Sequence, residues 1–274
     1  MKKQLTCAVI QDFSGHGRCS ATVALPLLSS YGICCSCVPT AVFSNHSGYD
    51  SYFFMDLTPQ LPGFIAEWKK LGLEFDGIYT GFFGSADQID IVENFISSFS
   101  IGKIIVDPVM GDNGKIFGTY TDSLCRRMSS LAAKADIITP NVTEACILTS
   151  TPYPQTAPTQ AFLDELAEKL MRIGPKSAVI TGIEQNGCIS NMVVTKQKTT
   201  LVTRPVSGKT RPGTGDVFAS VVVARVLNGA DLVDAVSFAA DFVGKSIALA
   251  DKLGTEQNAG VPFELLLADG EFRL

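Results

Sequence analysis

Short apolar runs alternate with amphipathic segments along most of this 274-residue chain. Continuous apolar runs are typical of strands that are buried on both faces. They cover residues 7–11, 32–43, 75–82, 103–109, 135–141 and 177–183. The segments between them have the spacing of helices: 20–32, 58–72, 85–99, 121–134 and 159–174. Ser85 and Thr121 stand where helix N-caps belong.

This alternation predicts an α/β fold in which a mostly parallel sheet has helices on both faces. Residues 186–206 break the rhythm and predict a hairpin at the sheet edge. Apolar helices are expected at 217–227 and 230–250, followed by a short C-terminal helix. Because the pattern shows no repeat and no linker, we expect one domain over residues 1–274. Ligands of such sheets bind outside the carboxyl ends of the strands.

Composition and charge narrow the function classes. Hydrophobic residues make up 46% of the chain and charged residues 18%, as in a compact globular protein. The formal net charge of −5 argues against a nucleic-acid-binding surface. No apolar run is long enough to span a membrane, and the N-terminal apolar stretch is too short for a signal peptide. We therefore expect a cytoplasmic protein without a membrane partner.

The chain has eight cysteines, two of which form a C-x-x-C pair, Cys34 and Cys37. A redox or zinc site would need a strand-to-helix turn or a second pair of ligands, and neither is present. The surrounding run reads as an apolar strand, so we expect these cysteines to be reduced and packed in the core.

The segment "PGTGD" joins a strand-like stretch to an apolar helix. Gly213 and Gly215 permit backbone conformations in which N–H groups point at one spot, and the helix start adds unpaired donors. Together these backbone groups would form an anion hole suited to a phosphoryl group. Asp216 follows in the first helical turn, either as a cap or as a base for an attacking hydroxyl. Taken alone, the tetrapeptide "GTGD" favours the interpretation of Asp216 as a helix cap.

Two further strand ends carry acidic residues. Asp107 closes one strand before Pro108, and Asn141 and Glu144 follow the next. Asp-Pro also forms turns, and Asn followed three residues later by Glu also forms a helix cap. At adjacent strand ends, however, Asp107 and Glu144 would suit Mg²⁺, which binds one or two carboxylates, water and phosphates.

Two more segments hold polar side chains. "QDFSGHG" ends the first strand with Asp12 and Ser14, and "FSNHSGY" contains His46 and Ser47. The first is also compatible with a tight turn, and an isolated histidine such as His46 is more often structural.

In combination, these segments resemble the ribokinase superfamily and, within it, the vitamin B6 kinases. The resemblance rests on "GTGD" at a helix start, on the "DP" and "TPN…E" strand ends, and on "FSNHSGY". It implies a ribokinase-like three-layer sandwich. It also implies an ATP-dependent kinase that phosphorylates the 5′-hydroxymethyl group of pyridoxal, pyridoxine or pyridoxamine.

The resemblance assigns a role to each candidate residue. Asp216 would be the catalytic base, and Gly213, Thr214 and Gly215 would cradle the γ-phosphate. Mg²⁺ near ATP would be held by Asp107 and Glu144, beside Asn141, and Thr181 would contact ATP. K⁺ is a further candidate cation, and a homodimer is expected. His46 and Ser47 would line the substrate site.

One segment departs from the B6 kinases. "QDFSGHG" is closer to hydroxymethylpyrimidine kinases, so Asp12 and Ser14 are expected to contact the substrate without deciding which ring they hold. Hydroxymethylpyrimidine kinase is therefore an alternative function. A ligand-binding member of the fold without catalysis is a second one, opposed by the intact Asp216, Asp107 and Glu144.

Overall fold

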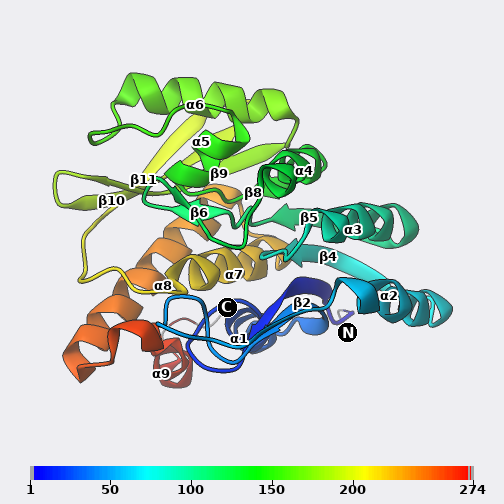
Figure 1. Ribbon diagram of the computed structural model, residues 1–274. Helices are drawn as coiled ribbons and strands as arrows, with labels where there is room; N and C mark the ends of the chain where they lie inside the picture. The colour runs from blue at the N-terminus through cyan, green and yellow to red at the C-terminus, as the bar shows by residue number, and fades with distance from the viewer. Residues whose placement is uncertain (1–2, 271, 273–274) are drawn as a thin grey trace.

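The computed structural model describes residues 3–270 and residue 272. A nine-stranded sheet forms its centre, in the order β11-β10-β9-β8-β5-β4-β1-β2-β3 (Figure 1). The strands of this sheet are β1 (Thr6–Ser14), β2 (Cys34–Phe43), β3 (Phe54–Asp56), β4 (Glu74–Thr80), β5 (Ser100–Val106), β8 (Ile137–Ile138), β9 (Ser177–Gln185), β10 (Cys188–Thr195) and β11 (Thr199–Pro205). A separate small hairpin pairs β6 (Gly111–Asp112) with β7 (Lys115–Ile116).

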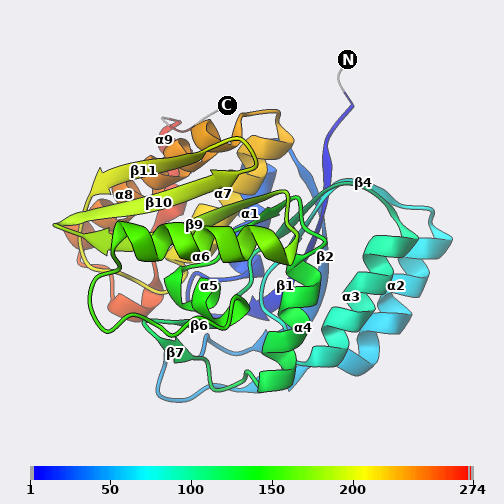
Figure 2. The same ribbon diagram turned by 90° about the horizontal axis from the view of Figure 1, so that it is seen from above.

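The helices form two layers, one on each face of the sheet. They are α1 (Ala21–Ser30), α2 (Leu61–Lys70), α3 (Ala86–Ser98), α4 (Asp122–Ala132), α5 (Val142–Leu148), α6 (Gln160–Ile173), α7 (Thr214–Leu227), α8 (Leu232–Leu253) and α9 (Phe263–Asp269), with short 3₁₀ turns η1 (Thr58–Gln60) and η2 (Gln257–Ala259). One core cluster joins the sheet to α2–α6, and a second joins it to α1, α7, α8 and α9. Figure 2 looks onto the layer that contains α3, α4 and α6.

Alternating side chains of the central strands explain the two layers. In β1, Ala8 and Ile10 pack toward α2–α6, whereas Cys7 and Val9 pack toward α7 and α8. Such strands are continuous apolar runs because both faces are buried. The α/β fold with a mostly parallel sheet, expected from the sequence, is confirmed.

The strand order indicates at which edge of the sheet a ligand is expected to bind. β1 pairs in parallel with β2 on one side and with β4 on the other, so the winding direction of the chain reverses at β1. In open α/β sheets, ligands bind outside the carboxyl ends of the strands at such a reversal. The hairpin predicted for residues 186–206 is present as β10 and β11, antiparallel at one edge of the sheet.

Several local predictions need correction. The short edge strand β3 and the β6–β7 hairpin were not predicted, because strands of two or three residues carry too little hydrophobic pattern. Thr121 caps α4 through a bond from the Leu124 N–H, whereas Ser85 precedes α3 without a side-chain cap bond. The Ser85 hydroxyl instead lies 3.0 Å from that of Thr58.

The prediction that the cysteines pack in the core is only partly correct. All eight cysteines, each within the described part of the chain, are free thiols. Cys34, however, is exposed and Cys37 only half-buried, so core packing is wrong for Cys34. The cause is that β3 pairs only with Ala41–Phe43, which leaves the first half of β2 at the edge of the sheet.

None of the helices in the described residues has the length and apolar character needed to cross a membrane.

Replacing Thr121 with Ala should cost about 1 kcal/mol of unfolding free energy, because α4 loses its side-chain cap. Thr121→Ser keeps a hydroxyl at the same position and should lower the unfolding free energy by only a few tenths of a kcal/mol. Urea denaturation of the two variants and the parent checks this, and equal losses for Ala and Ser would contradict it.

Candidate active site

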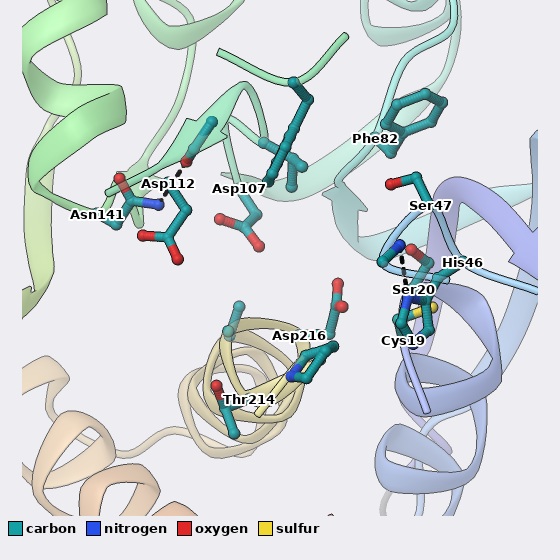
Figure 3. Close-up of a pocket in the computed structure, with 18 of the residues that line it drawn as sticks. Cys19, Ser20, His46, Ser47, Phe82, Asp107, Asp112, Asn141, Thr214 and Asp216 are labelled. Carbon is teal, nitrogen blue, oxygen red and sulfur yellow. Dashed lines mark hydrogen bonds between the residues drawn. The ribbon is translucent and has the colours of Figure 1, made fainter. Parts of the chain in front are cut away.

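A cavity of about 620 Å³ lies at the carboxyl ends of the central strands. Every site residue predicted from the sequence contributes to its lining: Asp12, Ser14, His46, Ser47, Asp107, Asn141, Glu144, Thr181, Gly213, Thr214, Gly215 and Asp216. The sheet explains this convergence, since parallel strands end at one edge. Figure 3 shows side chains from several separate segments around one open space.

The start of α7 forms one wall of the cavity. Gly213 stands at the N-cap position with φ 77°, a left-handed conformation, and no side chain of the described residues caps the helix. The Thr214 hydroxyl donates to the carbonyl of Arg211 at 2.9 Å, so it is turned back toward the preceding loop. The first N–H groups of α7 are therefore available to an anion.

Asp216 projects from the first turn of α7 into the cavity, toward Asp107 and Ser20 (Figure 3). Burial raises the pKa of its carboxyl to about 7, with a further rise from the charge of Asp12. The backbone N–H of Ser20 donates to it and partly offsets this rise. A carboxylate with a pKa near neutrality can accept a proton from a bound hydroxyl.

The opposite wall carries the residues expected to contact a substrate ring. Asp12 is 3% exposed and accepts a bond from the Ser14 hydroxyl at 3.0 Å. Burial raises the pKa of Asp12, while the Ser20 and Ser14 hydroxyls lower it. Phe43 and Phe82, which lie edge to face at 5.6 Å, add aromatic surface. This wall can hold a flat polar ring.

His46 lines the cavity, but its ring nitrogens are not free to bind a substrate. Its Nδ1 accepts the Gly48 N–H at 3.1 Å, and its Nε2 lies 2.8 Å from the carbonyl oxygen of Asn258. Both ring nitrogens are therefore engaged by the backbone. The exposed Ser47 beside it keeps its hydroxyl toward the cavity (Figure 3).

Glu144 and Asn141 form a reciprocal capping box at the start of α5. Glu144 Oε2 accepts the Asn141 N–H at 2.8 Å, and Asn141 Oδ1 accepts the Glu144 N–H at 2.9 Å. Glu144 Oε1 also accepts the Met110 N–H at 3.1 Å. The cap anticipated as an alternative is thus present, and it fixes Glu144 at the cavity wall.

Asp107 is buried beside Glu144 and accepts the Thr139 hydroxyl at 3.0 Å. Burial, together with the charge of Asp216, raises the pKa of Asp107 well above its usual range. Each carboxylate oxygen keeps a further lone pair, which suits Mg²⁺ bound partly through water. Among the described residues, no group of three or more His, Cys, Asp or Glu side chains could hold a metal alone. A cation here would depend on phosphate oxygens as well.

A second cavity of about 590 Å³ adjoins the first and shares Asn141, Thr181 and the start of α7 with it. Asp112 of β6 also lines both cavities and was missed by sequence reasoning. In the sequence it lies five residues after Asp107, within the stretch "DPVMGDNG". The shared wall can hold one elongated ligand against the α7 N-terminus.

Gly213→Ala should lower the unfolding free energy by about 2 kcal/mol or more, because a Cβ at this left-handed position would meet the Arg18 carbonyl. Gly215→Ala is the matched control, since its Cβ would meet nothing within 4 Å. It should change stability by less than about 1 kcal/mol. Urea denaturation that shows equal effects would contradict this view of the α7 start.

The raised pKa of Asp216 has a consequence for stability. Because the folded protein binds this proton more tightly than the unfolded chain, the stabilisation is complete below about pH 4 and is lost as pH rises through about 7. Asp216→Asn cannot ionise, so it should gain stability relative to the ligand-free parent between about pH 5 and 8. Urea unfolding at about pH 5 and about pH 8 measures the difference in stability between Asp216→Asn and the parent. Asp164→Asn, at an exposed position, is the control. A difference from the parent that is independent of pH would refute it.

Comparison with known proteins identifies the family of the chain. A family model described as phosphomethylpyrimidine kinase matches residues 30–261. A protein of Bacteroides thetaiotaomicron, assigned as a phosphomethylpyrimidine kinase, is 37% identical, with a TM-score of 0.94 over 100% of this chain and 96% of that one. A second crystal form of that protein was solved with pyridoxal.

Curated relatives fall into two activities. A pyridoxal kinase of Deinococcus radiodurans is 26% identical over 96% of this chain and 91% of its own. A hydroxymethylpyrimidine/phosphomethylpyrimidine kinase of Bacillus subtilis is 29% identical over 63% of each chain.

The matched family model covers most of the chain, residues 30–261. The chain belongs to the phosphomethylpyrimidine kinase family, among the ribokinase-like kinases that include the pyridoxal kinases.

Proposed function

We propose that this protein transfers the γ-phosphoryl group of ATP to the 5′-hydroxymethyl group of pyridoxal, pyridoxine or pyridoxamine. One observation carries the proposal: Asp216, with its pKa of about 7, lies at the uncapped start of α7 in a cavity that also holds Asp12 and Ser47. A base, an anion site and a ring site therefore share one space. The pyridoxal found in the Bacteroides relative supports the choice of ring.

The residues divide the work of phosphoryl transfer. Asp216 accepts the proton of the substrate hydroxyl as its oxygen attacks the γ-phosphorus. The first N–H groups of α7, from Gly213 onward, stabilise the charge on the transferring oxygens. The second cavity, with Asn141 and Thr181 on the shared wall, has room for the remainder of the nucleotide.

Asp107 and Glu144 would hold Mg²⁺ beside the phosphates, with Asp112 within the same wall. When bound, the ion neutralises charge on the phosphate oxygens. Without it, burial raises the pKa of Asp107, Asp216 and Asp12, and a neighbouring carboxylate raises that of Asp107 and Asp216 further. The role of K⁺ and the homodimer stay predictions.

Hydroxymethylpyrimidine kinase is the second candidate, favoured by Asp12 and Ser14. A buried carboxylate next to a hydroxyl can accept bonds from the amino group of a pyrimidine as well as from a pyridine phenol. The matched family model and the Bacillus relative support the same alternative. Both substrates would present a hydroxymethyl group to Asp216.

Asp216→Asn should lower kcat about 10²–10⁴-fold, because the transferring hydroxyl loses its base. The KM for the vitamer should change far less, since the ring site is intact. ADP release with each of the three vitamers and with hydroxymethylpyrimidine measures both constants. Asp164→Asn on α6 is the control and should match the parent.

The same assay separates the candidates. Higher kcat/KM for a B6 vitamer supports the proposal, and higher kcat/KM for hydroxymethylpyrimidine supports the alternative. Turnover of neither class by the parent, or near-parental kcat for Asp216→Asn, would refute the proposed mechanism.

A further inference from the structure

Three loops of the candidate site meet one short segment between α8 and α9. The segment, residues 255–260, is named here the C-terminal bridge. The loops are the substrate loop (residues 44–52), the phosphate loop (residues 207–213) and the glycine turn (residues 15–19). These four segments are far apart in the sequence, so their contacts are tertiary and link opposite walls of the cavity.

The substrate loop is attached through His46. Since the Gly48 N–H is a donor, the Nδ1 that receives it at 3.1 Å must be the unprotonated nitrogen. Nε2 then carries the proton and donates to the Asn258 carbonyl at 2.8 Å. In this tautomer neither nitrogen is left for a substrate, and the imidazole connects Ser47 and its neighbours to the C-terminal bridge.

The phosphate loop is attached through Arg211, which is 6% exposed. One terminal nitrogen of its guanidinium donates to the carbonyls of Thr255 at 2.8 Å and Glu256 at 3.0 Å. The other donates to Asp251 at 2.9 Å. Gln257 adds a bond to the carbonyl of Thr210. The residues directly before Gly213 are therefore fixed to the same segment as the substrate loop.

The glycine turn fills the space between these two attachments. Arg18 donates to the Ala259 carbonyl at 3.0 Å and pairs with Glu264 of α9 at 2.7 Å. The Arg18 carbonyl lies where a Cβ of Gly213 would be, and the His46 ring lies where a Cβ of Gly17 would be. Close packing of this kind transmits a displacement of one loop to the next.

We propose that the C-terminal bridge sets the distance between the ring site and the phosphate site, with His46 and Arg211 as its two positioning residues. This inference rests on the proposed function for its kinetic consequences, but not for its structural ones. His46 acts through the backbone of Asn258, and Arg211 through the backbone of Thr255 and Glu256. Since phosphoryl transfer depends on the placement of hydroxyl and phosphate, loosening either attachment should affect both sites.

Two substitutions of His46 separate positioning from substrate contact. The amide nitrogen of Gln reaches about as far as Nε2, so His46→Gln can still donate to Asn258. The shorter His46→Asn can accept the Gly48 N–H but cannot reach Asn258. If His46 is a positioning residue, His46→Asn should raise the KM for the vitamer about fivefold, as expected for one lost hydrogen bond. The KM of His46→Gln should stay near that of the parent. Equal effects of Gln and Asn would overturn the proposal.

Amide hydrogen exchange of the ligand-free protein tests the bridge without any activity. Arg211→Lys cannot satisfy Thr255, Glu256 and Asp251 together. It should therefore speed exchange about fivefold in the substrate loop as well as in the phosphate loop. If Arg211→Lys does not fold, Gln257→Ala is the milder variant. Faster exchange confined to the phosphate loop would overturn the proposal.

A matched control lies outside the bridge and outside all three loops. Arg172→Lys changes an exposed pair with Glu168 on α6. It should leave exchange in the substrate loop and the phosphate loop unchanged. If the parent phosphorylates none of the substrates, the proposed function fails, while the exchange result still decides the bridge.

Discussion

The bare start of α7 is the feature on which the candidate site depends. A helix begins with backbone N–H groups that need acceptors, and here the described side chains supply no cap. Gly213 makes this possible, because its left-handed conformation directs the chain past the Arg18 carbonyl into the helix. The unpaired donors are then an anion site by default, and the rest of the cavity is built around it.

Negative charge is the second constraint. Asp12, Asp107 and Asp216 face one partly closed space, and burial raises the pKa of each carboxyl. Such a group of acids is costly unless cations or protons accompany it. The arrangement therefore suits a ligand that brings its own cation, and it gives Asp216 a pKa at which proton transfer works near neutral pH.

The elements that sequence reasoning located are those with a strong local signal. Long apolar runs identified the parallel strands. Asp107 and Glu144 were found because they lie at or just after the ends of two such runs, and Gly213 because it stands before an apolar helix. The sequence pattern did not decide whether the polar residues at helix starts cap the helix or line a ligand site. At Asn141 and Glu144 both hold, since the capping box itself lines the cavity. At Asp216 the cap interpretation is not supported, because no side chain of the described residues caps α7.

Long-range contacts escaped prediction for a physical reason. The position of His46 is determined by Asn258, more than 200 residues away, and that of Arg211 by α8 and the segment after it. Neither contact leaves a mark in local periodicity. The exposure of Cys34 depends likewise on how far a three-residue strand extends along its neighbour.

A crystal structure with MgADP, fluoroaluminate and pyridoxal would test the central claim most directly, because the planar anion mimics the transferring phosphoryl group. The account predicts that this anion binds the first N–H groups of α7, with the Asp216 carboxylate within hydrogen-bond distance of the 5′-hydroxyl. An anion bound away from Gly213–Gly215, or a hydroxyl directed away from Asp216, would contradict it.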